Sequence, residues 1–358
     1  MIFVHLYNDF SGSPRVLKSV IDAYSKLQKD SILFIGSDGD GVLDGCPVEK
    51  VKYFYPKKKN KIFVLIAYLL SQVALFIQLS RFPLAKNHDT IYVNSLLPFA
   101  AAIYGKLLGK KVIYHIHEVS LRPRALFCFL LFIANRCADK QIYVSKAHLE
   151  QVAPKFSNCY VVHNSISESV YQGSLVRRPQ KAKGFSILMP ASLRTYKGID
   201  AFVKLSQLKY SRPIVWTLLL NDDASSVDNF RERHKHIQNL KIFDRVEDTS
   251  PFYSVSDLVV NLSYIDQWVE TFGLTLVEAF AFGLPVIAPP VGGPLEIVDH
   301  NINGFLVDSY DQGKIVKLIE SLLNDNEKYC NMSSSSLIKA NEFLPVRFEE
   351  NILKVILS

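Results

Sequence analysis

Two glutamates near residue 270 are the side chains with the clearest chemical potential in this sequence. In the stretch ETFGLTLVEAF (270–280), Glu270 and Glu278 lie eight positions apart around a glycine and an apolar run. The apolar spacing predicts a helix that begins near Gly273 and ends near Gly283. The first amide groups of such a helix have no partner within it and would point at an anion. These amides belong to Phe272, Gly273, Leu274 and Thr275.

The two carboxylates could address different parts of one ligand. Glu270 precedes the helix and can reach a group bound at its N-terminus. Glu278 lies one to two turns further along and can accept two hydrogen bonds from a diol such as ribose. The plainer alternative is that Glu270 caps the helix and Glu278 is a solvated charge. Because Glu278 lies between Val277 and Ala279 in a strongly apolar helix, we expect its carboxylate to have a partner.

A basic loop in PASLRTYKG (190–198) is the next candidate. A strand is predicted to end near Ser192, and Arg194 and Lys197 follow it on the way to a helix. Two cations beside a helix N-terminus suit a pyrophosphate, although an ordinary basic loop fits the sequence equally well. A glycine pair at 292–293 follows a later strand, where glycine would let the backbone approach a ligand closely.

The N-terminal half offers two weaker candidates. Gly12 lies at a strand–loop–helix junction that could bind an anion or simply turn, and no GxGxxG fingerprint accompanies it. In YHIHEVS (114–120), strand alternation places His115 and His117 on one face, with Glu118 opposite if the strand continues. No third ligand is near, so a hydrogen-bonding histidine in a substrate cleft is favoured over a metal site.

Short β-branched runs alternate with helical segments along the whole chain, which predicts parallel sheets covered on both faces. A polar stretch at 167–184 separates two such series and is interpreted as a linker. The predicted fold class is therefore α/β, with two Rossmann-like, doubly wound domains over 1–166 and 185–344, and the cleft between them is the default ligand site. The predicted strands cover residues 2–7, 31–36, 90–95, 111–117, 141–145, 160–165, 185–192, 214–220, 240–246, 257–263, 285–290 and 304–307.

Composition limits the class of protein. The 358 residues are 49% hydrophobic and carry a net charge of +7. The charge is uneven, because residues 1–180 carry +11 and residues 181–358 carry −4, so an anionic partner is expected for the first half. No nucleic-acid-binding motif occurs. Five scattered cysteines favour a reducing compartment, and the N-terminus is interpreted as a first buried strand rather than a signal peptide.

The segment at 56–82 complicates this picture. Four lysines precede eighteen residues, 62–79, that are apolar except for three polar side chains, of which Ser71 and Gln72 are adjacent. The length could span a membrane, but the polar pair at mid-segment argues against it. A second apolar run at 125–135 also follows basic residues. We favour a surface that docks on an anionic bilayer over a span and over two plain core helices.

In their order and spacing, these stretches resemble the retaining glycosyltransferases of family 4, which have the GT-B fold. The resemblance covers nearly the whole chain. It is most specific over ETFGLTLVEAF, which VGGPLEIV and NGFLV follow at the expected distances, and VVHNSI (161–166) and KGI (197–199) also match. It implies that 1–166 binds the acceptor and 185–344 a nucleotide-sugar donor, and that the C-terminal helix at 345–358 returns to the first domain.

The resemblance also implies roles for the residues of the second domain. Glu270 would bind hydroxyls of the donor sugar near the reacting centre, and Glu278 would hold the ribose. Lys197 and Arg194 would neutralise the diphosphate as it leaves. The backbone around Phe272–Leu274 would contact the sugar and the phosphate.

In the first domain, His117 would contact the donor sugar and Gly12 would face the phosphate or the acceptor. Two positions depart from the family pattern. Ser192 stands where the family's loop carries an arginine, with Arg194 two residues later, and Ser13 stands in place of the second glycine of the first-domain pair. The sequence leaves open whether Arg194 takes over the role of the missing arginine.

The implied activity is transfer of a sugar, such as a hexose, from a UDP- or GDP-linked donor to a glycan acceptor. The acceptor is expected to be lipid-linked, in bacterial-type surface polysaccharide biosynthesis, with the enzyme cytoplasmic and peripheral at the inner face of the cell membrane. No metal is required if Lys197, Arg194 and helix amides stabilise the leaving group, and the DxD letters at 38–40 lie in the other domain. The alternatives are a GT-B epimerase of nucleotide sugars and a non-catalytic binding module.

Overall fold

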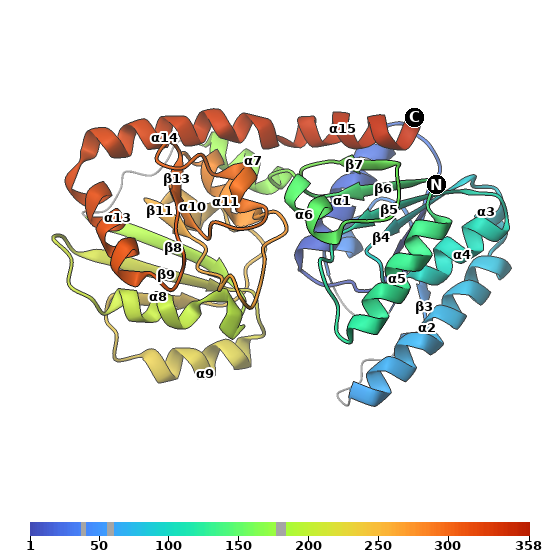
Figure 1. Cartoon of the computed structure of the whole chain (residues 1–358), viewed down its shortest axis with the longest axis horizontal. Coiled ribbons are helices and arrows are strands. Elements are labelled where there is room, and N and C mark those ends of the chain that lie inside the picture. Colours follow the sequence, from blue (N-terminus) through green and yellow to red (C-terminus); the bar gives the residue numbers. More distant parts are fainter. Residues whose placement is uncertain (37–40, 56–60, 177–183) are drawn as a thin grey trace. The chain divides into compact units, whose positions relative to one another are not determined.

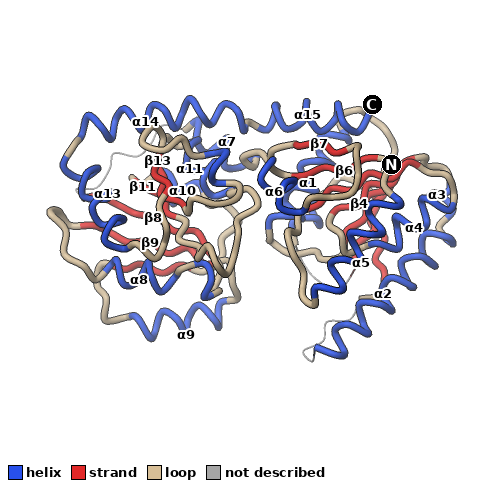
Figure 2. Tube along the Cα trace, in the orientation of Figure 1, coloured by secondary structure: helices blue, strands red, loops and turns tan. Residues whose placement is uncertain are grey.

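The chain forms two compact units (Figure 1). The N-terminal unit comprises Met1–His163 together with Phe348–Ser358, and the C-terminal unit comprises Asn164–Arg347. Each is built on one sheet of parallel strands with helices on both faces (Figure 2), so the predicted α/β class with two Rossmann-like domains is confirmed. The computed structural model describes residues 1–36, 41–55, 61–176 and 184–358.

The sheet of the N-terminal unit has the order β3-β2-β1-β4-β5-β6-β7. In this arrangement the chain winds outward in one direction from β1, and then in the other direction from β4. The strands are β1 (Ile2–His5), β2 (Ile32–Gly36), β3 (Glu49–Tyr53), β4 (Thr90–Asn94), β5 (Lys111–Ile116), β6 (Lys140–Tyr143) and β7 (Cys159–Val161). The helices are α1 (Gly12–Ser25), η1 (Val42–Gly45), α2 (Lys61–Arg81), α3 (Pro83–Lys86), α4 (Phe99–Leu107), α5 (Arg124–Cys137), α6 (Lys146–Val152) and α15 (Pro345–Leu357).

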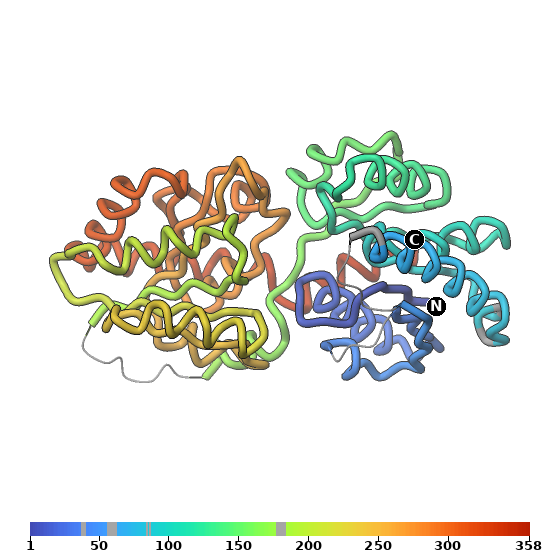
Figure 3. Tube along the Cα trace, turned by 90° about the horizontal axis from the view of Figure 1, so that it is seen from below, coloured from blue at the N-terminus to red at the C-terminus, as the bar shows by residue number. Residues whose placement is uncertain are grey.

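The central strands of this unit are buried on both faces because helices cover both. Ile2 and Val4 of β1 point to the side where α2, α4 and α5 pack. Phe3 points to the opposite side, where α1 packs together with Phe348 and Ile352 of α15. The last helix of the chain therefore completes the core of the first unit, and Figure 3 marks its end, the C-terminus, on that unit.

One strand, β3, is not among the predicted ones. It lies at the edge of the sheet, next to β2. Glu49, Lys50 and Lys52 are exposed, and only Tyr53 is buried. Charged residues are common on edge strands because they discourage pairing with other chains. Because of these charges β3 has no continuous apolar run, the pattern from which the other strands were predicted.

The sheet of the C-terminal unit has the order β10-β9-β8-β11-β12-β13. It repeats the winding of the first sheet, with the change of direction between β8 and β11. Its strands are β8 (Phe185–Ala191), β9 (Ile214–Leu220), β10 (Leu240–Phe243), β11 (Leu258–Val260), β12 (Val286–Ala288) and β13 (Gly304–Leu306). Its helices are α7 (Glu168–Leu175), η2 (Thr195–Lys197), α8 (Ile199–Ser206), α9 (Ala224–His234), α10 (Ser250–Ser254), α11 (Leu274–Ala281), α12 (Pro294–Ile297), α13 (Gln312–Asn324), α14 (Asn326–Ala340) and η3 (Asn341–Phe343).

The range predicted as a linker, 167–184, contains helix α7. Ser167 caps this helix by accepting a hydrogen bond from the amide of Val170, whose side chain is buried. The helix packs against α10 and α11 of the C-terminal unit. Residues 177–183 of the predicted linker, like 38–40 and the lysines at 57–59, lie outside the described residues.

Candidate active site

The change of winding direction in the C-terminal sheet places two loops side by side. In doubly wound sheets, ligands bind beyond the carboxyl ends of the strands where the order reverses. Here those strands are β8, which leads into residues 192–198, and β11, which leads into residues 261–273. The backbone amide of Tyr264 donates to the carbonyl of Tyr196 over 2.9 Å and joins the two loops directly.

Lys197 and Glu270 form an ion pair at this junction. Lys197 Nζ lies 2.8 Å from Glu270 Oε2, and each side chain is about one-fifth exposed. The side chains of Asn261 and Trp268 also lie near the Glu270 carboxylate and help to lower its pKa, and the Lys197 ammonium lies 5.1 Å from the centre of the Trp268 ring. The bond from Lys197 orients Glu270, and because a carboxylate has about four lone-pair sites, it can also accept from hydroxyl donors of a ligand.

The surroundings of Glu270 favour its ionised form. Burial alone would raise the pKa of this carboxyl group, but the neighbouring Lys197 ammonium and its hydrogen bond, together with the side chains of Asn261 and Trp268, outweigh burial, and the pKa lies below its ordinary value. Glu270 is therefore a fixed anion at neutral pH. Such a group can accept hydrogen bonds from sugar hydroxyls and can stabilise positive charge that develops nearby.

Arg194 lies in the same loop but is placed differently from Lys197. Its side chain is exposed, and no ion pair to it occurs among the described residues. Beside it, Tyr196 stacks on Trp268 with ring centres 5.0 Å apart and planes 17° apart. Lys197 and Glu270 thus lie together in the structure, whereas Arg194 is exposed in the same loop.

The α11 helix begins as predicted. Gly273 is its N-cap with φ +113°, and the helix runs over Leu274–Ala281, with Gly283 beyond its end at φ +61°. Its first-turn amides lie next in sequence to Glu270, where an anion can accept from them. Phe272 contributes only backbone to this surface, because its ring is buried against Phe343 with centres 5.7 Å apart.

Glu278 is buried in α11, as its apolar neighbours indicate, and only 8% of it is exposed. The hydroxyl of Tyr253 donates to Glu278 Oε2 over 2.7 Å, so the predicted partner exists. Tyr253 is fully buried and stacks on Phe282. The hydrogen bond from Tyr253 thereby holds the carboxylate in one orientation.

Gly198 makes the approach of the two loops possible. Its φ is +73°, and a Cβ atom added to it would lie 2.0 Å from the carbonyl oxygen of Leu262, just beyond β11. The glycine pair at 292–293, predicted to approach a ligand, instead lies against the backbone of Glu270 and Phe272. The amide of Gly293 donates to the Glu270 carbonyl over 2.8 Å. These glycines therefore position the Glu270 segment.

Replacing Gly198 by alanine is expected to destabilise the C-terminal unit by more than 2 kcal/mol, because a left-handed backbone is strained for alanine and the added Cβ collides with backbone. Gly109→Ala is the matched control. Gly109 has φ +63°, but a Cβ there would meet nothing within 4 Å, so we expect about 1 kcal/mol of strain alone. Urea unfolding of both variants measures the difference, and equal losses would contradict the role given to the Leu262 contact.

In the N-terminal unit, Asn94 connects the predicted residues. It ends β4, beside β1 where the strand order reverses. Its Oδ1 lies 2.9 Å from His117 Nε2, and its Nδ2 donates to the carbonyl of Ser13 over 3.2 Å. Because the amide oxygen only accepts, His117 carries its proton on Nε2, which leaves Nδ1 as an acceptor. Gly12, the first residue of α1, is exposed next to Ser13.

His115 in β5 and His117, the residue after its end, point to the same side as predicted, with ring centres 4.4 Å apart. Burial lowers the pKa of His115 to about 3, and burial followed by repulsion from His115 lowers the pKa of His117 well below its ordinary value. Both rings are therefore neutral at physiological pH. No group of three or more histidine, cysteine or acidic side chains in the described parts of the chain could hold a metal ion.

Four residues of these sites are not among the predicted ones: Asn261, Trp268, Tyr253 and Asn94. Asn94 and Asn261 each lie at the carboxyl end of a strand where the strand order of the sheet reverses. Ligands bind at such positions in doubly wound sheets, so this placement could have indicated both residues. Trp268 lies two residues before Glu270, and no sequence pattern there indicates that its side chain belongs to the site. Tyr253 lies 25 residues from Glu278, and only the packed structure joins them.

Comparisons with known proteins show that the chain is similar to glycosyltransferases. Residues 176–336 match the family model described as Glycosyl transferases group 1, a range that contains both loops at the strand reversal. An uncharacterized glycosyltransferase of Haemophilus influenzae is 23% identical in an alignment of 356 positions that covers 95% of each chain. The N-acetyl-alpha-D-glucosaminyl L-malate synthase of Bacillus anthracis is 25% identical over 303 residues, covering 78% of this chain and 77% of that one.

Solved structures share the fold over the full length. HepE of Anabaena in complex with UDP has a TM-score of 0.80 at 20% identity, covering 99% of both chains. The same protein in complex with UDP-glucose has a TM-score of 0.79 at 19% identity. At this identity the likeness establishes the GT-B fold, and with the family match it supports a glycosyltransferase of the GT-B type.

Proposed function

We propose that this protein is a retaining glycosyltransferase of family 4 that transfers a sugar from a nucleoside-diphosphate sugar to a glycan acceptor. The observation that carries the proposal is the Lys197–Glu270 pair, held at the strand reversal next to the first turn of α11. That constellation lies within the range matched by the family model. A UDP-linked donor is favoured because a full-length structural relative binds UDP and UDP-glucose.

The reaction places opposite charges on two groups as the anomeric bond breaks. The departing diphosphate becomes more negative, and Lys197 together with the first-turn amides of α11 stabilises it electrostatically. The sugar becomes positive at its anomeric carbon, and the ionised Glu270 holds its hydroxyls and opposes that charge. In a retaining reaction the acceptor hydroxyl attacks from the side that the diphosphate leaves. His117, neutral and accepting at Nδ1, is assigned to a donor-sugar hydroxyl, and exposed Arg194 to the diphosphate.

A panel of nucleotide sugars tests this function. Ligands that bind only the folded protein raise its melting temperature, so UDP-, GDP-, TDP- and ADP-linked sugars are compared by thermal shift. A UDP-sugar is expected to give the largest shift, and donor hydrolysis or transfer should follow. An epimer formed from donor alone would indicate the epimerase alternative, while binding without turnover would indicate a binding module.

Glu278→Ala is expected to weaken UDP binding by a factor of about 10² to 10⁴, since a hydrogen bond to a charged group contributes about 1.5–3 kcal/mol and the ribose offers two. Tyr253→Phe is the control, because it removes the hydroxyl that touches Glu278 while leaving the carboxylate in place. We expect it to weaken binding less than tenfold. Calorimetric titration with UDP measures both, and unchanged affinity in a folded Glu278→Ala variant would refute the ribose assignment.

We further assign the acceptor to a lipid-linked glycan of surface polysaccharide biosynthesis, and the enzyme to the inner face of the cell membrane. The net charge of +11 over residues 1–180 supports this assignment, because the anionic cytoplasmic leaflet attracts basic surfaces. Transfer to lipid extracts compared with water-soluble glycans tests the acceptor. Activity confined to soluble acceptors would overturn that part and leave the donor assignment intact.

A further inference from the structure

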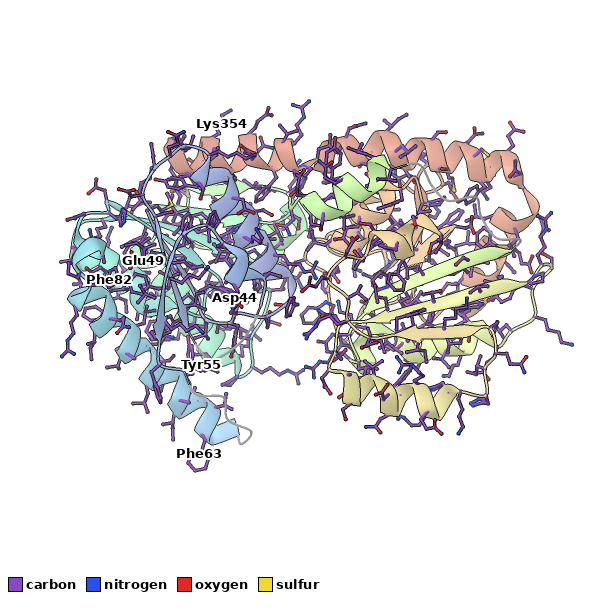
Figure 4. The ribbon with its side chains drawn as sticks, turned by 180° about the vertical axis from the view of Figure 1, so that it is seen from behind. Asp44, Glu49, Tyr55, Phe63, Phe82 and Lys354 are labelled. Carbon is purple, nitrogen blue, oxygen red and sulfur yellow. The ribbon has the colours of Figure 1, made fainter. Side chains whose placement is uncertain are left out.

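The outward side of α2 is apolar over most of the helix. The exposed residues between positions 63 and 77 are all hydrophobic, with exposed fractions between 40% and 59%. They are Phe63, Leu65, Ile66, Leu69, Leu70, Val73 and Ile77. Figure 4 labels Phe63 near one end of α2 and Phe82 just past the other end. Continuous apolar exposure of this kind is unusual on a soluble monomer and marks an interaction surface.

The exposed residues span a broad arc of the helix. At 100° per residue they are spread over about 160°. A helix that pairs with one partner helix presents a narrower seam, formed by two positions in seven. The breadth of this arc fits a wide, flat apolar environment better than a single partner helix.

Helix α5 extends the same surface. Cys128, Phe129 and Phe132 are exposed on it. Phe99 at the start of α4 joins the two helices, because its ring lies 6.2 Å from that of Tyr68 in α2 and 5.5 Å from that of Phe129. We call the exposed apolar residues of α2 and α5 the apolar face.

The charged residues within the sequences of α2, α4 and α5 are all positive. Arg81 ends α2, Lys106 lies in the last turn of α4, and Arg124 and Arg136 lie at the two ends of α5, all of them exposed. The sequences of α2, α4 and α5 contain no aspartate or glutamate. The guanidinium of Arg136 lies 5.7 Å from the ring centre of Phe132, which is how a basic side chain covers an apolar one while its charge stays at the surface.

We propose that the apolar face docks on an anionic lipid bilayer, with α2 lying in the plane of the interface. Its hydrophobic residues would enter the boundary between headgroups and acyl chains, and the arginines and lysine at its margins would meet lipid phosphates. The proposal concerns this surface alone. A protein that binds vesicles but no nucleotide would satisfy it, and one that binds nucleotide but no vesicles would not.

The packing of α2 distinguishes docking from spanning. By length and a mean hydropathy of 2.0, Phe63–Arg81 could cross a membrane. However, Ser71 and Gln72, the polar pair at mid-helix, are buried against the protein. Gln72 Oε1 accepts from the amide of Ala100 over 3.3 Å, and the hydroxyl of Tyr68 donates to the carbonyl of Leu97 over 2.6 Å.

Leu75 and Leu79 on the same side of α2 are fully buried in the core of the N-terminal unit. Spanning would pull this whole side out of that core and expose its polar groups to hydrocarbon, at a cost of several kcal/mol for each unsatisfied group. A helix lying in the interface keeps its inner side on α4 and places only its outer side in lipid.

Vesicle flotation of the full chain tests the docking. We expect binding to vesicles of phosphatidylcholine with 30% phosphatidylglycerol at low salt, and at least tenfold weaker binding to pure phosphatidylcholine or at high salt, because screening removes the electrostatic part. Leu70→Glu combined with Val73→Glu should lower the affinity for anionic vesicles at least tenfold. Ile338→Glu is the control, since Ile338 is 72% exposed in the C-terminal unit.

Two native thiols supply a test without substitution. Cys128 is exposed on the apolar face, and Cys330 is exposed on α14 of the C-terminal unit. Anionic vesicles should slow the reaction of Cys128 with a charged maleimide about fivefold or more and leave Cys330 unchanged, as read by mass spectrometry of the peptides. Absence of flotation, equal flotation of the double variant, or equal protection of both thiols would each overturn the proposal. So would a dimer that the Leu70 and Val73 substitutions dissociate, since a second copy would then be the occupant.

Discussion

Lys197→Met is expected to lower kcat by a factor of about 10² to 10³, the range observed when one preorganised donor to a developing negative charge is removed. Methionine keeps the length of the side chain and removes its charge. The loss should appear in kcat more than in KM, because the charge on the diphosphate grows as the bond to the sugar breaks. Steady-state kinetics with a UDP-sugar measures both constants.

The companion Lys204→Met separates this effect from a general loss of positive charge. Lys204 is exposed on α8, the helix that follows the Lys197 loop, and its replacement should change kcat less than twofold. A Lys197→Met enzyme that retains more than a third of wild-type kcat would contradict the role of Lys197 at the leaving group.

Lys197→Met is also expected to lower the stability of the folded protein. In the wild type burial raises the pKa of Glu270, but Lys197, with Asn261 and Trp268, lowers it by more, so the pKa lies below its ordinary value. Ionised Glu270 therefore contributes stability above its unfolded pKa and loses that contribution as pH falls through the folded value. Without Lys197 the partly buried carboxylate has lost its cation, and we expect a cost of about 1–3 kcal/mol at pH 7. Adding Glu270→Gln should restore much of the stability but none of the activity.

Much of the fold follows from the sequence alone because parallel strands buried on both faces are continuous apolar runs. β4 and β5 of the first sheet, for example, are fully or almost fully buried along their length, and both were predicted to within a residue. β3 was not predicted, because it has the charged residues that are typical of a sheet edge rather than an apolar run. α7 was not predicted either, because a polar helix of eight residues shows little hydrophobic periodicity. Its formation depends on contacts with α10 and α11.

At the site, residue types were predictable and pairings were not. Lys197 and Glu270 are 73 residues apart, and the sequence indicated both as ligand-binding groups without indicating that they bind each other. Their contact depends on which strands neighbour β8 in the sheet, a property of winding order that local pattern does not carry. The same holds for Glu278, whose apolar neighbours require a partner but do not identify Tyr253.

The histidines of the first unit lead to the second large effect, a loss of stability in mild acid. Burial lowers the pKa of His5 to about 4 and that of His148 to about 4, and the pKa values of His115 and His117 are lowered as well. The unfolded chain therefore binds protons below pH 6.5 that the folded unit does not, so stability falls as pH falls from 6.5 toward 4. One such histidine corresponds to about 1.36 kcal/mol per pH unit.

One nearby group acts in the opposite direction. Burial raises the pKa of Glu118, against hydrogen bonds from Ser95 and from backbone amides, so the folded unit can take up one proton there as the pH falls. Its single proton offsets at most one of the four histidines. The N-terminal unit should therefore lose on the order of 3 kcal/mol or more between pH 6.5 and 4.5.

Hydrogen exchange in peptides of β4 and β5, followed from pH 7 to pH 4.5 after correction for intrinsic rates, reports the stability of the N-terminal unit. Both tryptophans, Trp216 and Trp268, belong to the C-terminal unit, so their fluorescence reports whether that unit stays folded over the same range. His115→Gln removes one titrating ring and should lower the slope of stability against pH by about 1.36 kcal/mol per unit. An N-terminal unit whose protection is independent of pH, or a slope that His115→Gln leaves unchanged, would show that these rings are not held neutral by burial. Either result would also remove the basis for treating His117 as a neutral acceptor in the transfer reaction.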